Sequence, residues 1–269
     1  MRPRFYTFTA LALLIAAPVL AQAPTYTRTP GEVLRYRIST DSESTTFTPT
    51  AAFDRIFERD LNLAFTFEEA DSVEAAVERF DLESGDPLDL QSYDLVDDIE
   101  GAFRFALRAD SMGSVAQRPE LTRDPVLGSS IAGELKLFFP PLPQDPLTEG
   151  TTWTWSRNVE SEQGGTFSDA YTFRVVNETT MSGYKVQVIE MTGETTTQGL
   201  FETSTGSDVN LDNKETHTCT YYFAVDEGLL VGFDRTTETK AYSEIEAMGR
   251  TMTSDRESTT TTKARLHSR

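Results

Sequence analysis

The chain has 269 residues, with 43 acidic and 24 basic side chains, and its formal net charge at pH 7 is −19. A charge of this sign and size repels nucleic acids and anionic lipid surfaces, so we expect no nucleic acid partner. The sequence contains one cysteine, Cys219, and two histidines, His217 and His267. These counts exclude an intrachain disulfide and most familiar zinc and hydrolase motifs, and we expect no cofactor.

Residues 1–21 have the pattern of a secretory signal peptide. Arg2 and Arg4 precede the apolar run Thr9–Leu20, and small residues follow at Ala21 and Ala23. The run is shorter than the roughly 20 apolar residues that cross a bilayer, so cleavage after Ala21 is expected rather than a transmembrane segment. The residue directly after the predicted cleavage site is Gln22 and not a cysteine that could carry a lipid. The sequence therefore predicts an exported, soluble, periplasmic or extracellular protein without a lipid anchor, whose mature chain has a formal charge of −21.

Alternation of apolar and polar residues dominates the rest of the chain and predicts a mainly β fold. We expect an antiparallel, strongly curved sheet, or an open barrel or sandwich. A hairpin is expected where Asp226, Glu227 and Gly228 separate two alternating runs, because Gly228 can adopt the left-handed conformation of a short loop. The other alternating runs are Leu34–Ile38, Leu61–Phe67, Phe103–Leu107, Trp153–Trp155, Tyr171–Val175 and Tyr184–Val188.

Three further segments have distinct patterns. One mid-chain helix is predicted after Asp124 and Pro125, with apolar residues at helical spacing from Val126 to Phe138, and a weaker helical pattern covers Ala51–Arg59. The block Phe139–Pro143 is typical of a stiff, extended connector. The Thr-rich stretch 236–266 predicts long strands with one wet face, and a disordered tail from residue 254 onward is the alternative.

These patterns divide the chain into a signal peptide (1–21), an N-terminal β half that ends in the helix (22–139), a proline-rich connector (140–149) and a C-terminal β half (150–269). The halves share short motifs, such as Ala64–Phe67 and Ala170–Phe173. Alternating sequences also match by chance, so both a duplication and unrelated halves remain open. The alternative to two domains is one continuous domain.

The order of several motifs resembles a family of exported bacterial β-rich proteins of unknown function. The motifs are the opening strand Gly31–Tyr36, the strand end Arg79–Leu82, the segment Gly101–Phe105, the capped helix, the block Phe139–Pro143, the segment Pro146–Trp153 and the late segment Tyr222–Leu230. The resemblance covers most of the chain after the signal peptide. It implies a β-rich exported protein and brings no activity and no catalytic residue.

The weak metal candidates are Asp208, Asn210 and Asp212, which place oxygen ligands at alternate positions as a calcium loop does. The pattern then fails, because Asn213 replaces the turn glycine and Cys219 replaces the twelfth-position glutamate. A surface loop is the favoured interpretation. The same reasoning applies to Asp94, Asp97 and Asp98.

Other chemical motifs are also weak. His217 and Cys219 share one face of a strand, where a buried histidine beside a core cysteine is favoured over a nucleophilic or metal site. Ser129 lies in Gly128–Ala132, which only loosely resembles a nucleophile elbow because the segment falls within the predicted helix. Trp153 and Trp155 can stack on a sugar, although core aromatics are favoured. We therefore predict no catalytic residues and no defined ligand-binding residues.

The leading hypothesis is a non-catalytic binding or scaffold protein of the bacterial envelope, whose partner is an apolar ligand or an envelope protein. One alternative is a periplasmic carrier that holds an apolar ligand or lipid in a curved-sheet cavity. A second alternative is an unrecognised hydrolase that uses carboxylates, which requires two acids facing each other across a cleft.

Overall fold

The computed structural model describes residues 23–27, 29–68, 72–84, 99–100, 103–107, 114–117, 120–121, 131, 133–160, 164–202, 208–247 and 250–269. Three sequence-based predictions lie outside these residues: the signal peptide at 1–21, the acidic group Asp94, Asp97 and Asp98, and Ser129. No helix in the described part of the chain has the length and apolar character that crossing a membrane requires.

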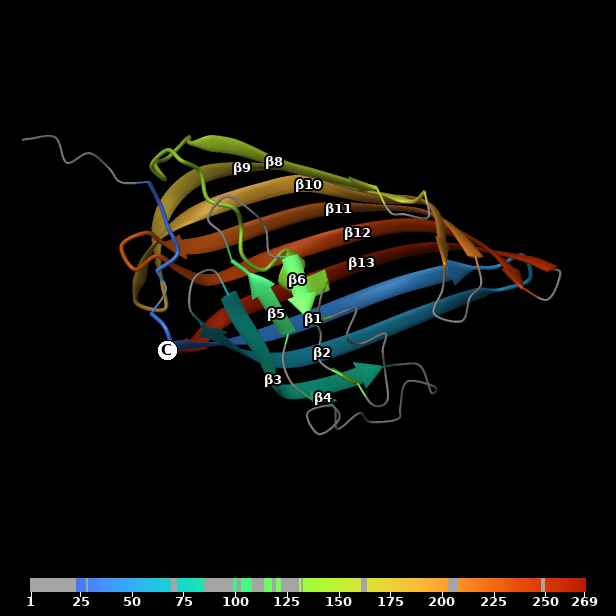
Figure 1. The fold of residues 1–269 in the computed structure, drawn as a ribbon, viewed down its shortest axis with the longest axis horizontal. Helices are drawn as coiled ribbons and strands as arrows, with labels where there is room; N and C mark the ends of the chain where they lie inside the picture. The colour runs from blue at the N-terminus through green and yellow to red at the C-terminus, as the bar shows by residue number, and fades with distance from the viewer. Residues whose placement is uncertain are drawn as a thin grey trace, which may run out of the picture.

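The fold is mainly β, as the alternation predicts (Figure 1). Eleven strands form one antiparallel sheet in the order β6-β5-β3-β2-β1-β13-β12-β11-β10-β9-β8, and β4 pairs with β7 separately. The sheet is open, because β6 and β8 are edge strands. The strands are β1 (Val33–Phe47), β2 (Ala52–Phe67), β3 (Ser72–Ser84), β4 (Ile99–Glu100), β5 (Phe103–Ala106), β6 (Ser114–Gln117), β7 (Glu120–Leu121), β8 (Thr152–Glu160), β9 (Thr166–Met181), β10 (Tyr184–Glu202), β11 (Asp208–Ala224), β12 (Leu229–Ala247) and β13 (Arg250–Ser268).

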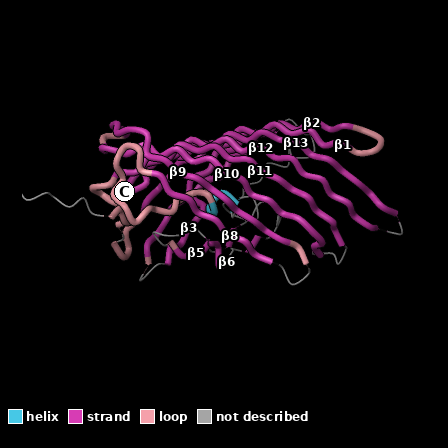
Figure 2. The backbone as a smooth tube through the Cα atoms, turned by 90° about the horizontal axis from the view of Figure 1, so that it is seen from above, coloured by secondary structure: helices cyan, strands magenta, loops and turns pink. Residues whose placement is uncertain are grey.

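The first and the last strand, β1 and β13, pair in the middle of the sheet. Strands from the first half extend from β1 to one edge, and strands from the second half extend from β13 to the other edge. The two edge strands β6 and β8 therefore come from the middle of the chain. The described residues before β8, 131 and 133–151, lie on the concave face, where the short helix is seen (Figure 2).

The Thr-rich C-terminal stretch consists of the long strands β12 and β13, so the alternative of a disordered tail is wrong. Both strands have paired neighbours on both sides, which satisfies their backbone groups even where few side chains are buried. The helix predicted over Ala51–Arg59 is also wrong, because this segment belongs to β2. A tight turn at 48–51 pairs it with β1 along its whole length, and sheet pairing overrides a weak local pattern.

The mid-chain helix is short. The backbone is helical at 131 and 133–136, and the preceding residues of the predicted helix lie outside the described part of the chain. We call residues 131 and 133–147 the central segment. Its apolar side chains are buried against the concave face, and Phe138 contacts the rings of Tyr36, Phe65 and Phe233 at centroid distances of 5.0, 4.8 and 5.2 Å.

The proline block of the central segment is buried rather than exposed. Extended chain of this kind has no neighbouring strand, so its carbonyl groups need other donors. Side chains from three parts of the chain donate to carbonyl groups of the block and of Leu137 just before it: Tyr221 Oη to Leu137 O (2.8 Å), Tyr26 Oη to Pro140 O (2.5 Å) and Trp153 Nε1 to Pro141 O (2.9 Å). These hydrogen bonds fix the central segment across the half of the sheet that is nearest the C-terminus.

Candidate ligand-binding cleft

The concave face changes character along the strands. Near the C-terminus it is an apolar core covered by the central segment. Farther toward the opposite end of the same strands, the side chains on the concave face become polar. In β12 the core residue Phe233 gives way to Thr237 and Thr239, and in β13 the core residue Ala264 gives way to Thr260 and Ser258. Because alternate residues of a strand share one face, this change places a polar surface beside the helix.

The polar surface is hollowed into a cleft of about 520 Å³, a volume in the range of small-molecule sites. Side chains of β1, β2, β11, β12, β13 and the central segment line it, so both halves of the chain contribute. The lining residues are Thr40, Ser42, Phe57, Arg59, Gly133, Glu134, Leu137, Leu211, Asn213, Glu215, His217, Arg235, Thr237, Thr239, Ala241, Arg256, Ser258 and Thr260.

Three buried charges lie at the inner end of the cleft. Glu134 of the central segment accepts from Arg59 Nη2 at 2.8 Å and from Arg235 Nη2, and all three residues are at most 9% exposed. Burial by itself would raise the pKa of Glu134, but the positive charges of Arg235 and Arg59 lower it below the usual value. Two guanidinium groups against one carboxylate leave this end of the cleft with one excess positive charge.

A second buried carboxylate, Asp169 of β9, lies beside the cleft. It accepts from Lys136 Nζ at 2.6 Å, from Arg157 Nη2 at 2.8 Å and from Thr195 Oγ1 at 2.8 Å. Burial opposes its ionisation, but these partners, Lys136 first, lower the pKa of Asp169. Lys136 belongs to the central segment, Arg157 to β8 and Asp169 to β9, so the Asp169 carboxylate connects these three parts of the chain.

His217 is buried in the wall of the cleft as a neutral side chain. Its Nδ1 lies 3.0 Å from Thr237 Oγ1, and its Nε2 lies 3.3 Å from Thr195 Oγ1. Desolvation and the nearby charges of Arg235 and Lys136 lower the pKa of His217 to about 4. Cys219 follows on the same face of β11, where burial raises the thiol pKa to about 12. Both residues are therefore buried side by side in β11, as the sequence pattern favours.

Several polar groups of the cleft have no partner among the described residues. Nη1 of Arg235 and Oδ1 of Asn213 are buried without a hydrogen bond. Arg256 forms no ion pair with any described acid, and desolvation together with the positive charge of Arg55 lowers its pKa. Across the whole lining, three arginines face two glutamates, in a chain whose net charge is −19. The cleft is thus locally positive and retains unused hydrogen-bonding groups.

An apolar row borders the cleft at the end of the sheet opposite the C-terminus, which we call the distal end (right in Figure 1). Met252, Ile245, Val209 and Phe201 are successive cross-strand partners from β13 to β10. The ring of Phe201 lies 5.2 Å from that of Phe167 in β9. By alternation, all five side chains are on the concave face, so the row continues the cleft surface across five strands.

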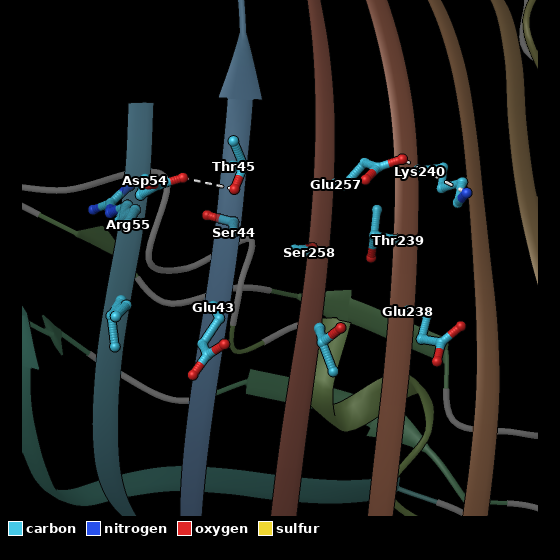
Figure 3. Close-up of a pocket in the computed structure, with 12 residues that line it drawn as sticks. Glu43, Ser44, Thr45, Asp54, Arg55, Glu238, Thr239, Lys240, Glu257 and Ser258 are labelled. Carbon is cyan, nitrogen blue, oxygen red and sulfur yellow. Dashed lines mark hydrogen bonds and ion pairs between the residues drawn. The ribbon is translucent and has the colours of Figure 1, made fainter. Parts of the chain in front are cut away.

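The convex face carries a separate depression of about 440 Å³, shown in Figure 3. Glu43, Asp54, Glu238 and Glu257 line it together with Lys240, whose Nζ lies 3.6 Å from Glu257 Oε1. Both members of this ion pair are more than 60% exposed, and such pairs contribute at most about 1 kcal/mol. The depression has no buried charge, and the concave cleft is the better candidate site.

The predicted metal candidates do not converge. Asp208, Asn210 and Asp212 lie in strand β11 rather than in a surface loop, so the loop interpretation is wrong. They alternate along the exposed face of one strand, with about 7 Å between successive Cα atoms. Within the described residues, no three acids, cysteines or histidines form a metal-binding group. Trp153 and Trp155 are half-buried, and they stack on Phe173 and Tyr171.

The charged residues of the cleft were missed in the sequence, although it contains a signal for them. Arg59 is in phase with the core residues Leu61 and Leu63 of β2, and Arg235 is in phase with Phe233 of β12. A charged residue at a core-facing position of an alternating run indicates a buried partner. The identity of that partner, Glu134, was not accessible, because its contact with Arg235 joins residues 101 positions apart.

Comparison with known proteins gives no family. No family model matches the chain, and no curated protein matches its sequence. One similar solved structure is of lipid–protein interactions in lipovitellin, with 11% identity over 90% of this chain and 26% of that chain and a TM-score of 0.47. Another is OccK11 (OpdR) of Pseudomonas aeruginosa, with 7% identity over 91% and 99% of the chains and a TM-score of 0.27. This chain thus spans about a quarter of the lipovitellin chain, and neither likeness assigns a function.

Proposed function

We propose that this protein is a non-catalytic binding protein, exported to the bacterial envelope, that holds a ligand in the concave cleft. The observation that carries the proposal is the division of the concave face. The central segment fills the apolar half, whereas the polar half remains an open cleft of about 520 Å³ with buried, partly unpaired polar groups. Buried polar atoms without partners are costly, and a bound ligand would satisfy them.

The protonation states in the cleft favour binding over catalysis. A carboxylate that acts as a general acid needs a raised pKa, yet the pKa values of Glu134 and Asp169 are lowered by their cationic partners. A histidine base works best near neutral pH, yet the pKa of His217 is about 4. Burial keeps the Cys219 thiol protonated. These states argue against the carboxylate hydrolase that was the second alternative.

The alternative of an apolar carrier, as first framed, requires an empty apolar cavity under the curved sheet. The apolar half of the concave face is instead packed with the rings of Phe138 and Phe139 from the central segment. A ligand would therefore meet the polar half first. This packing favours a ligand with at least one polar or charged group.

The test is retention of a small molecule from an extract of the host. The full-length protein is incubated with the extract, freed from unbound material and analysed by native mass spectrometry for an added mass. Thr239 lines the cleft, so a Thr239→Trp variant fills it, whereas Lys240→Trp places the same side chain on the convex face. We expect the added mass with the wild type and with Lys240→Trp, and its loss with Thr239→Trp.

Two results would overturn the proposal. One is that no mass is retained by the wild type from an extract that contains the host's soluble and lipid fractions. The other is that the ligand is retained equally by Thr239→Trp and Lys240→Trp, which would place the binding site away from the concave face. Circular dichroism of both variants confirms that the sheet has formed.

A further inference from the structure

We infer that the ligand of the concave cleft is an anionic amphiphile, with an acidic headgroup held by Arg256 and an acyl chain that lies on the distal apolar row. This inference rests on the proposed function and names the chemical class of its ligand. It combines two features of the concave face that neither the core nor the ion pairs explain: among the described residues, Arg256 has no acidic partner, and an apolar surface has no covering segment.

The first feature is the charge around Arg256. Arg256 of β13 and Arg55 of β2 lie near each other across β1, close enough for the charge of Arg55 to lower the pKa of Arg256. The acids next to Arg256 in the sequence, Asp255 and Glu257, do not face it, because they alternate to the convex face. Glu215 is the acid of the cleft wall on this side, and its Oε1 already accepts from Asn213. An anion bound at Arg256 would relieve the repulsion.

The second feature is the apolar row Met252–Ile245–Val209–Phe201–Phe167. Each member is a cross-strand partner or ring contact of the next, so the row is continuous over five strands. Met252 is 54% and Phe167 is 38% exposed, although both face the concave side, where core residues are normally covered. No described segment of the chain covers the row, because the central segment packs at the other end of the sheet.

The geometry joins the two features into one site. Arg256 follows Met252, the β13 member of the row, by four residues on the same face of the strand, which corresponds to about 14 Å. Between them the concave face carries small or apolar side chains, Ser254, Ser243 and Leu211, which leave room for a chain to pass. A single acyl chain lying across the strands can therefore reach the row while its headgroup meets the guanidinium of Arg256.

The occupant is a free molecule with one acyl chain rather than a membrane. The surface of a bilayer is convex or flat, whereas strand alternation places this row on the concave face of the sheet, whose curvature Figure 2 shows. The net charge of −19 also repels anionic bilayers, whereas one acidic headgroup inside the locally positive cleft is attracted. Monomeric fatty acids have this chemistry.

The experiment compares three probes by titration calorimetry, with laurate below the concentration at which it forms micelles and dodecanol below its solubility limit. Laurate has the charged head and the tail, dodecanol has the tail with a neutral head, and acetate has the head alone. We expect laurate to bind at least about tenfold more tightly than dodecanol, because charge-assisted hydrogen bonds are stronger than hydrogen bonds between neutral groups. We expect no measurable binding of acetate, which lacks the apolar tail.

Matched variants assign the two parts of the site. Arg256→Gln should weaken laurate binding about tenfold and leave dodecanol unchanged, whereas Lys240→Gln on the convex face should change neither. Val209→Ser should weaken both probes about threefold or more through lost apolar contact. Leu200→Ser changes an exposed apolar residue on the opposite face of the neighbouring strand and should change neither.

The outcomes separate this inference from the proposed function. If a host ligand is retained in a manner sensitive to Thr239→Trp, but laurate does not bind, the protein is a binding protein and the amphiphile inference is wrong. Equal affinity for laurate and dodecanol, or no effect of Arg256→Gln on laurate binding, would refute the claim that Arg256 binds an anionic headgroup. If the protein cosediments with phosphatidylglycerol vesicles but does not bind monomeric laurate, it binds a membrane surface rather than a single amphiphile in the cleft, and the inference is wrong.

Discussion

Arg59 of β2 and Glu134 of the central segment are 75 residues apart in sequence, yet Arg59 Nη2 lies 2.8 Å from Glu134 Oε1 in a buried ion pair. Arg235 of β12 binds the other carboxylate oxygen. The carboxylate thus joins the central segment to strands from both halves of the chain. It also separates the apolar core from the open cleft, because these charges lie where the concave face changes from apolar to polar.

The first prediction concerns this carboxylate. Glu134→Gln removes the carboxylate that two buried guanidinium groups share, and removing one partner from a buried pair typically costs about 3–5 kcal/mol. We expect the free energy of unfolding, measured with urea, to fall by that amount. Glu78→Gln is the control, since Glu78 binds Arg35 at 2.9 Å in an exposed pair, and we expect it to change stability by less than about 1 kcal/mol. Similar losses for the two variants would contradict the buried charge cluster.

The second prediction concerns acid. The pKa of His217 is about 4 in the folded protein and near 6.5 when unfolded, so the unfolded state binds more protons between these values. Stability should therefore fall as the pH drops from 7 to 5, and His217 alone contributes a loss of about 2 kcal/mol. His217→Gln stays neutral, so its urea-derived stability should fall less over the same range. Parallel pH profiles for wild type and variant would refute the neutral, buried histidine.

The third prediction concerns the anchor of the central segment. Phe138 is fully buried and contacts the rings of Tyr36, Phe65, Phe139 and Phe233. We expect Phe138→Ala to lower the free energy of unfolding by about 3–5 kcal/mol, because it removes these contacts and leaves a cavity.

Phe53→Ala is the matched control for Phe138→Ala. Phe53 of β2 is 59% exposed, so its truncation should cost less than about 1 kcal/mol. If Phe138→Ala were as mild as this control, the central segment would not be packed on the sheet in solution, and the concave face would be open along its whole length.

The strands could be predicted from the sequence because their signal is local. Leu61, Leu63, Phe65 and Phe67 alternate with polar residues, and this spacing alone defines a half-buried strand. The hairpin at Gly228 was equally local: β11 ends at Ala224, β12 begins at Leu229, and Gly228 has a φ of 60°. The error at Ala51–Arg59 has the same origin. A weak local pattern was read as a helix where pairing with β1 decides the structure.

The cleft could not be predicted, because it depends on contacts between distant parts of the chain. The pairing of Ser42 with Thr260 brings together residues that are 218 positions apart, and it places both on one wall of the cleft. The sequence likewise gives no sign that the proline block lies buried under Tyr26 and Tyr221, since each of these side chains donates to a carbonyl group far away in sequence. A proline-rich segment between two halves has the same composition whether it separates them or packs on both.

The last prediction uses two glycines of the concave face that differ in their surroundings. A Cβ atom on Gly193 of β10 would lie 2.3 Å from the carbonyl oxygen of Ala170 and 2.4 Å from Cδ1 of Tyr171. Neither the backbone of Ala170 nor the packed ring of Tyr171 can move aside without disturbing the sheet, so we expect Gly193→Ala to lower the free energy of unfolding by about 1–3 kcal/mol. A Cβ atom on Gly133 of the helical turn meets nothing within 4 Å. Gly133→Ala should therefore be neutral or stabilise the protein by up to about 1 kcal/mol.

Both glycine variants differ from the wild type by one methyl group, so urea unfolding compares them directly. The sign of the difference is the decisive result, because the intrinsic preference of alanine over glycine acts in the same direction at both positions. Only the contact of the new methyl group with Ala170 and Tyr171 makes the Gly193 variant the less stable of the two. A Gly193→Ala variant as stable as Gly133→Ala would mean that β9 and β10 are farther apart there than the structure places them.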